Sequence, residues 1–331
     1  MNSEIPLVSV VCTTFNHESY IRPALDGFVI QQCNFPIEVI VHDDASTDNT
    51  VAIIQEYVAK YPFIRAILQT ENQYSKGFNI WGYLFEKETK GKYIALCEGD
   101  DYWTDPYKLQ KQVDFLEANE DFAICFHPVK IRMEEEDKIV DDFITPNVFD
   151  VTDIYQLAGE NYIQTVTVVF KTNSHVFDEF NKMKNLAVGD YVLHMLNAQY
   201  GKIKKLNDCM AVYRMHNGGI WAKKEIEYTY PKSIDLLDSL KSVISGDGVK
   251  QIIDGQKGRI ALDLCVYYLK KNEYNLSLQY YIIAMECAPN TVFDLFQRKY
   301  YALQSIKKSK AYRLGKCLLR PFALLKSSKN H

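Results

Sequence analysis

The sequence lacks the features that define several large classes of protein. Its 331 residues include no run near the roughly 18 apolar residues that a membrane-spanning helix needs. The net charge of −4 gives no basic field that would favour nucleic acid. The N-terminus has no charged start followed by a long apolar core, so we expect no signal peptide, and residues 7–12 indicate a strand instead.

The eight cysteines are scattered and form no CxxC pair. Several of them fall inside apolar, strand-like runs. This pattern favours buried free thiols in a reducing cytoplasm over a disulfide framework or a zinc site. The expected location is therefore cytoplasmic.

The common phosphate-binding loops are also missing. No GxGxxG follows a strand, and GxxxxGK[ST] does not occur. A bound nucleotide would therefore need a metal ion to neutralise its pyrophosphate.

The most informative stretch is residues 93–103, YIALCEGDDYW. An apolar run there meets three carboxylates, Glu98, Asp100 and Asp101, as a buried strand does when it ends at the edge of a sheet. Three carboxylates in four residues repel one another unless a cation is present. Oxygen ligands alone favour Mg²⁺ or Mn²⁺. The alternative is a solvated acidic turn that caps the next helix.

Strands and helices alternate in the first hundred residues. Residues 7–13, 37–42 and 64–69 are β-branched or apolar runs, and two helical patterns separate them, the first beginning at about Ser19. This order predicts an α/β fold with a mostly parallel sheet flanked by helices. Ligands bind beyond the carboxyl ends of such strands. We therefore expect residues 13–16, Asp43 with Asp44, and the acids at 98–101 to converge on one edge.

The pattern continues less regularly beyond Trp103. Asp105 and Pro106 predict a helix start, as cap and first residue, and Gly189 marks the return of a helical pattern. The acidic residues 133–142 indicate a solvated hairpin or loop. Strands are expected at 122–127, 164–170 and 209–214.

The C-terminal third is mainly helical. Residues 259–270 and 274–287 predict an antiparallel pair joined near Asn272, and the tail from Ser305 mixes lysine and arginine with leucine and has no acid. Such a basic amphipathic tail is typical of contact with an anionic membrane surface, and equally of a packed helix with a solvated basic face. The predicted regions are 1–222, 223–304 and 305–331.

Several segments together resemble one family. The segments VSVVCTTFNHESYI, EVIVHDDASTDNT, GKYIALCEGDDYWTDPYKLQKQ, VGDYVL and YRMHNGG lie in the order found in family 2 glycosyltransferases of the GT-A fold. They span roughly residues 7–219, and the combination of the DDxSxDxT turn with the later acidic cluster is specific. The resemblance implies a transfer from a nucleotide sugar, with a UDP-sugar favoured, to a glycan or lipid-linked acceptor in surface polysaccharide biosynthesis.

The resemblance also implies roles for individual residues. Asp190 stands at the position of the catalytic base, where Gly189 replaces the first acid of the usual ED pair, so a single carboxylate implies an inverting displacement. Asp100 and Asp101 would bind Mn²⁺ or Mg²⁺, helped by His216, with Glu98 nearer the ribose. The nucleotide pocket would be lined by Thr13, Thr14, Phe15, Asn16, Asp43, Asp44, Glu98 and Asp100.

Each of these residues also has an ordinary structural interpretation. Without the resemblance to the family, Asp190, Asp43 and Asp44 would more often cap helices, and His216 would be structural.

Two other functions share features with the sequence. A sugar nucleotidyltransferase needs a Gly-rich basic loop after the first strand, which CTTFNHESY lacks. A catalytically inactive nucleotide- or glycan-binding protein would not need the acids at 98, 100, 101 and 190.

Overall fold

The computed structural model describes residues 5–183, 189–218 and 225–294. It divides into two compact units, residues 1–256 and 257–331. The predicted boundary at residue 222 and the basic tail 305–331 both lie outside the described residues. No helix in the described ranges combines the length and apolar character needed to cross a membrane.

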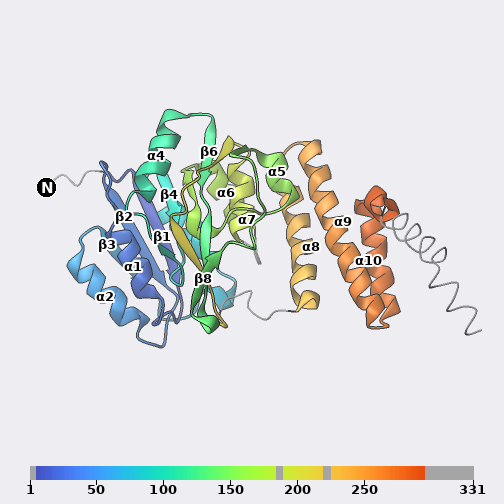
Figure 1. The fold of residues 1–331 in the computed structure, drawn as a ribbon, viewed down its shortest axis with the longest axis horizontal. Coiled ribbons are helices and arrows are strands. Elements are labelled where there is room, and N and C mark those ends of the chain that lie inside the picture. Colours follow the sequence, from blue (N-terminus) through green and yellow to red (C-terminus); the bar gives the residue numbers. More distant parts are fainter. Residues whose placement is uncertain (1–4, 184–188, 219–224, 295–331) are drawn as a thin grey trace, which may run out of the picture. The chain divides into compact units, whose positions relative to one another are not determined.

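The first unit is built on an eight-stranded sheet with the order β3-β2-β1-β4-β10-β6-β11-β9 (Figure 1). Strands β3, β2, β1 and β4 are parallel, while β10 lies antiparallel between β4 and β6. The predicted α/β architecture with a large, helix-flanked sheet is confirmed. Its strands are β1 (Val8–Thr14), β2 (Ile37–Asp43), β3 (Ile64–Leu68), β4 (Tyr93–Leu96), β6 (Phe122–Phe126), β9 (Val151–Thr152), β10 (Val169–Lys171) and β11 (Lys202–Lys205).

A second sheet of four strands has the order β5-β12-β7-β8. It comprises β5 (Tyr102–Trp103), β7 (Val129–Met133), β8 (Lys138–Asp141) and β12 (Ala211–Met215). The expected acidic hairpin is confirmed as β7 and β8, joined by the 3-10 turn η3 (Glu134–Glu136). Because β5 directly follows the acidic cluster and pairs with β12, this sheet brings residues 211–215 beside the acids.

The α-helices connect the strands as the sequence pattern predicts. In α1, the residues Ile21, Ala24, Leu25 and Phe28 form the buried stripe, which packs against the central strands. The first unit contains α1 (Ile21–Val29), α2 (Thr50–Lys60), α3 (Ile80–Tyr83), α4 (Lys108–Ala118), α5 (Ile154–Gly159), α6 (Ser174–Lys182), α7 (Gly189–Asn197) and α8 (Ile226–Val243). Three single turns complete it: η1 (Tyr74–Lys76), η2 (Leu84–Glu88) and η4 (Thr165–Thr167).

The C-terminal helix pair is also present. Helix α9 (Asp247–Lys270) is followed by α10 (Tyr274–Cys287), and Asn272 in the turn between them adopts φ 62°. Within the second unit, the Ser277 hydroxyl donates to the Cys265 carbonyl at 2.9 Å. The predicted junction near Asn272 is therefore confirmed.

Two local predictions were wrong. Helix α4 begins at Lys108 rather than at Pro106, because Asp105 accepts the backbone N–H of Tyr107 and closes a turn first. The strand expected at 164–170 is reduced to β10. The residues before it form η4, where the Thr167 hydroxyl donates to the Gln164 carbonyl at 2.7 Å. The Thr167 hydroxyl thus occupies a backbone carbonyl that could otherwise have accepted a hydrogen bond from a neighbouring strand.

Candidate functional site

The acidic cluster is held against the end of β1 by close backbone packing. The Gly99 N–H donates to the Thr13 carbonyl at 2.9 Å. A Cβ on Gly99 would lie 2.7 Å from Thr14 Oγ1, so only glycine allows this approach. The loop therefore places Glu98, Asp100 and Asp101 just beyond the carboxyl end of the strand, at the edge that the sequence predicts.

The three carboxylates lie close enough to share one cation. Oxygen atoms from Glu98, Asp100 and Asp101 all lie within 4.8 Å of one another. Burial and the negative charges of Asp100 and Asp190 raise the pKa of Glu98 to about 8. Burial, followed by the charge of Asp100, raises the pKa of Asp101 well above its ordinary value. A divalent cation would relieve this repulsion, so the donor set fits Mg²⁺ or Mn²⁺.

Asp100 differs from its two neighbours because two imidazoles face it. Burial alone would raise the pKa of Asp100, but the hydrogen bond with His216 and the charges of both histidines outweigh it and lower that pKa. The Asp100 Oδ2 atom lies 3.1 Å from His216 Nε2 and 3.8 Å from His17 Nε2. The predicted neighbour, His216, is therefore placed beside Asp100, and His17 joins it from the loop after β1.

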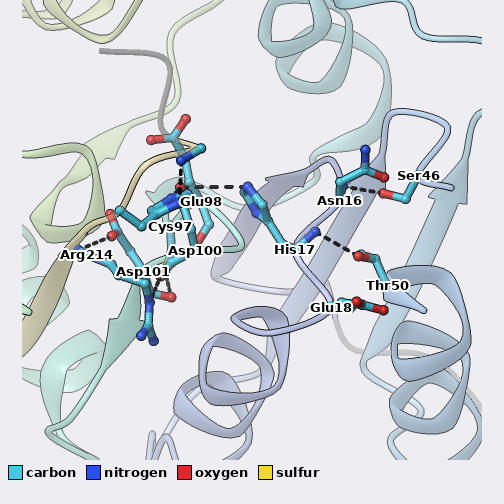
Figure 2. Close-up of polar contacts among 12 residues, drawn as sticks. Asn16, His17, Glu18, Ser46, Thr50, Cys97, Glu98, Asp100, Asp101 and Arg214 are labelled. Atoms are coloured by element: carbon cyan, nitrogen blue, oxygen red, sulfur yellow. Dashed lines mark hydrogen bonds and ion pairs between the residues drawn. The ribbon is translucent and has the colours of Figure 1, made fainter. Parts of the chain in front are cut away.

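A buried arginine ties the acidic loop to the smaller sheet. The backbone N–H of Arg214 donates to Asp101 Oδ1 at 2.7 Å, and its Nε donates to the Asp100 carbonyl at 2.6 Å. Its Nη1 pairs with Glu134 in the acidic hairpin. Figure 2 shows Arg214 beside Asp101 in the acidic loop. The Arg214 side chain is 8% exposed, so solvent screens these contacts only weakly. Arg214 thus fixes the backbone of the loop that carries the acids.

The turn after β2 packs against the loop after β1. Asp43 accepts the N–H of Ser46 at 2.9 Å, and both carboxylate oxygens of Asp44 accept backbone N–H groups, from Gln73 at 2.7 Å and Tyr74 at 3.0 Å. Both acids are buried. These bonds hold the segment 43–46 and the loop at Gln73 in one arrangement beside the predicted nucleotide pocket.

The remaining predicted pocket residues differ in exposure. Thr13 is half-buried, and its Oγ1 lies 3.4 Å from Trp81 Nε1. The Thr14 hydroxyl is buried, with no hydrogen-bond partner among the described residues. Phe15 is 43% exposed at the surface of the loop. Asn16 is also exposed, and its Oδ1 accepts the Thr47 N–H at 2.8 Å.

Asp190 lies in the first turn of α7 and faces the same region. Its Oδ1 accepts the N–H of Tyr191 at 2.7 Å, and its Oδ2 lies 3.3 Å from the Thr165 hydroxyl and 3.5 Å from Asn161 Nδ2. Burial raises the pKa of Asp190, and these donors oppose the increase. The charge of Asp190 acts on Glu98, so the structure brings the predicted base and the acidic cluster together.

Sequence reasoning missed several residues of this site. They are His17, Asn161, Thr165, Tyr213 and Arg214. Tyr213 is half-buried, and burial followed by the charges of the four acids raises the pKa of its hydroxyl. The run YR directly before MHNGG could have drawn attention to Tyr213 and Arg214. Asn161 and Thr165 carry no local signal, because a separate helix brings Asp190 to them.

A family model matches more than half of the chain. The model is described as glycosyl transferase family 2, and it matches residues 9–183. The solved structure of S. aureus TarS 1–349 in complex with UDP-GlcNAc has a TM-score of 0.59 at 16% identity, covering 83% of this chain and 90% of that one. The mannosyltransferase PcManGT from Pyrobaculum calidifontis, in complex with GDP-Man and Mn²⁺, has a TM-score of 0.54 at 16% identity, covering 99% and 88%. These two likenesses show the fold.

Curated relatives match over about two thirds of the chain. The uncharacterized protein Rv1520 of Mycobacterium tuberculosis is 43% identical over 217 residues, which cover 65% of this chain and 60% of the relative. The putative teichuronic acid biosynthesis glycosyltransferase TuaG of Bacillus subtilis is 27% identical, covering 66% and 83%. The glucosyltransferase WfaP of Escherichia coli, named for UDP-Glc and a GlcNAc-diphosphoundecaprenol acceptor, is also 27% identical, covering 66% and 81%.

Proposed function

The chain belongs to glycosyl transferase family 2, and we propose that it is an inverting glycosyltransferase. It would move a sugar from a nucleoside-diphosphate sugar, with UDP-sugars favoured, to a hydroxyl of a glycan or lipid-linked acceptor. The observation that carries the proposal is that Asp190 lies near enough for its charge to act on Glu98, a member of the Glu98–Asp101 cluster. One carboxylate is available for the proton, and a separate group is available for the leaving diphosphate.

In this mechanism, Asp190 removes the proton from the acceptor hydroxyl. The acceptor oxygen then bonds to the anomeric carbon, while the bond from that carbon to the diphosphate oxygen breaks and its electron pair leaves with the nucleoside diphosphate. A single displacement inverts the anomeric centre. Asn161 and Thr165 hold the Asp190 carboxylate in place through its Oδ2.

The acidic cluster would hold the leaving group through a cation. We propose Asp100 and Asp101 as the ligands, with His216 beside Asp100 and Glu98 nearer the ribose. When bound, Mn²⁺ or Mg²⁺ would neutralise charge developing on the diphosphate. The chain's own contribution is to fix the loop that carries Glu98, Asp100 and Asp101. Gly99 allows this loop to pack closely on the end of β1, and Arg214 in β12 donates to its Asp100 carbonyl.

The biological setting is also a proposal. Names of relatives such as TuaG and WfaP support surface polysaccharide biosynthesis, a UDP-sugar donor and a lipid-linked acceptor. The match spans 60% of the length of Rv1520, so activity, donor and acceptor are inferred for this chain. A lipid-linked acceptor would suit a cytoplasmic protein whose basic tail, 305–331, contacts the inner face of an anionic membrane.

A donor panel with Mn²⁺ tests the proposal. We expect one of the UDP-, GDP- or dTDP-sugars to raise the melting temperature and to release nucleoside diphosphate. Asp190→Asn should bind that donor normally but lose about 100- to 10,000-fold in rate, as expected for removal of a general base. The exposed Asp178→Asn in α6 is the matched control and should leave the rate unchanged. Tight binding without release would indicate a binding protein, and release of pyrophosphate from a nucleoside triphosphate would indicate a nucleotidyltransferase.

A further inference from the structure

His17 lies beside the acidic cluster, and neither nitrogen of its half-buried ring has a hydrogen bond within the described part of the chain. Its Nδ1 is buried without a partner. Its Nε2 faces Asp100 Oδ2 at 3.8 Å, which is too long for a hydrogen bond. A buried polar group of this kind usually has a partner, and none of the described residues provides one.

The loop that carries His17 is fixed before any ligand binds. The His17 N–H donates to Thr50 Oγ1 at 2.8 Å, and the N–H groups of its neighbours, Asn16 and Glu18, donate to Ser46 Oγ at 2.8 Å and Asp48 Oδ2 at 3.1 Å. Figure 2 shows the backbone on the side of Thr50 and the ring directed toward the acidic loop. The backbone from which the ring extends toward the acidic loop is therefore held in place.

The two histidines beside Asp100 are not equivalent. His216 Nδ1 accepts the N–H of Gly218 at 3.3 Å, so its proton lies on Nε2, which donates to Asp100 at 3.1 Å. That bond commits His216 to orienting Asp100. His17 is held too far away to do the same, although its ring lies edge-on to that of His216, with centroids 6.2 Å apart.

The surroundings of His17 indicate where its proton lies. A buried N–H without an acceptor is rarer in proteins than an acceptor without a donor. We therefore assign the proton to Nε2, which faces the Asp100 carboxylate, and the lone pair to the buried Nδ1. The proposed cation would sit beside these carboxylates, and an N–H donor directed there is suited to an oxygen of the anion that would accompany the cation.

We propose that His17 is a further catalytic residue, which donates its Nε2–H to a diphosphate oxygen of the bound nucleotide. This inference rests on the proposed function. The bond would strengthen as negative charge develops on the leaving diphosphate, so it would stabilise the transition state more than the bound donor. No covalent step at His17 is involved, and the proton stays on Nε2.

Calorimetric titration of the full chain with UDP and with uridine, both in the presence of Mn²⁺, tests the proposal. A hydrogen bond to a charged group is worth about 1.5–3 kcal/mol, so His17→Ala should weaken UDP binding by about 10- to 100-fold. Uridine lacks the diphosphate and should bind His17→Ala as it binds the wild type. His17→Gln, whose amide N–H can reach a similar position, should recover most of the affinity for UDP. The exposed His175→Ala in α6 is the control and should change neither titration.

Each alternative result overturns the proposal. Equal losses for UDP and uridine would make His17 a support of the nucleotide pocket only. Unchanged UDP binding in His17→Ala would remove it from the site. Spin-echo spectra of bound Mn²⁺ that lose a ¹⁴N coupling in His17→Gln would make it a metal ligand instead. A wild-type chain that binds UDP but shows one of these results refutes this inference alone, whereas a wild-type chain that binds no nucleoside diphosphate refutes the proposed function as well.

Discussion

Replacing Lys108 with methionine should stabilise the protein at neutral pH. Lys108 lies in α4 with its side chain fully buried. Its Nζ donates to Gln112 Oε1 at 2.8 Å and lies 4.3 Å from the centre of the Trp103 ring. Burial lowers the pKa of Lys108 from 10.5 to about 7, and no carboxylate pairs with it among the described residues.

The size of the effect follows from this pKa. The unfolded chain keeps the ordinary value, so it binds more protons than the folded chain between pH 7 and 10.5, and stability rises with pH across that window. Each unit of pKa difference corresponds to about 1.4 kcal/mol. At pH 7, where the folded-state lysine is about half protonated, its burial therefore lowers the free energy of unfolding by roughly 4 kcal/mol. Methionine removes this cost but leaves Gln112 Oε1 without its donor, at about 1–3 kcal/mol. The expected net gain is on the order of 2 kcal/mol.

Urea unfolding at pH 7, 8 and 9 measures this difference. The advantage of Lys108→Met over the wild type should shrink by about 1 kcal/mol per pH unit as the wild-type lysine loses its penalty. Lys111→Met on the same helix is the control, because Lys111 is partly exposed and paired with Asp105, and its effect should not change with pH in this range. A Lys108→Met protein that is less stable at pH 7, or an advantage that stays constant with pH, would refute the reasoning.

Three further results are expected. As the proposed base, Asp190 would have to be ionised, and its pKa is raised, so kcat/KM should fall as pH falls through a value above the ordinary aspartate range. Thr165→Val removes a hydrogen-bond donor to the carboxylate and should move that fall to higher pH. A pH profile unchanged in Thr165→Val would contradict the assignment. Arg214→Lys should weaken Mn²⁺ binding, measured by calorimetry, by roughly 10-fold, because the hydrogen bond from Arg214 Nε to the Asp100 carbonyl is lost. Equal affinities of the variant and the wild type would show that the acidic loop does not need this support. Deleting residues 305–331 should abolish flotation with anionic liposomes, and equal flotation of both proteins would exclude the tail as a membrane contact.

The sequence predicted the edge of the sheet at which the acids meet. Strand β1 is buried along almost its whole length, and a polar run begins in its last two residues, Thr13 and Thr14, so the position of the site follows from a local pattern. The same holds for Glu98–Asp101 after β4. Such features can be predicted because a buried central strand is mostly apolar, and a cluster of polar residues after it indicates where the strand ends.

The contacts that orient the site could not be predicted in the same way. Arg214 meets Asp100 across 114 positions of the chain, and Thr165 meets Asp190 across 25. Neither contact leaves a periodic pattern, because each depends on the relative placement of two elements. The same reason explains the error at 164–170, where the apolar residues suited a strand but tertiary hydrogen bonds to Val166 and Thr167 favoured a turn.

The buried pair Lys108–Gln112 is connected to the turn η4, which carries Thr165, and this connection gives a reason for its presence. Gln112 accepts a hydrogen bond from the Lys108 ammonium through its Oε1. Its Nε2–H groups donate to the Cys125 carbonyl at 2.8 Å and to the Thr167 carbonyl at 2.9 Å. Thr167 closes the same turn from which Thr165 reaches Asp190. An apolar residue in place of Gln112 would remove this buried donor from both carbonyls. The network therefore lowers stability at position 108 while it fixes the turn that orients the proposed base. Lys108→Met, which retains Gln112, should raise the free energy of unfolding without reducing the rate of transfer. Gln112→Leu should reduce both the free energy of unfolding and the rate.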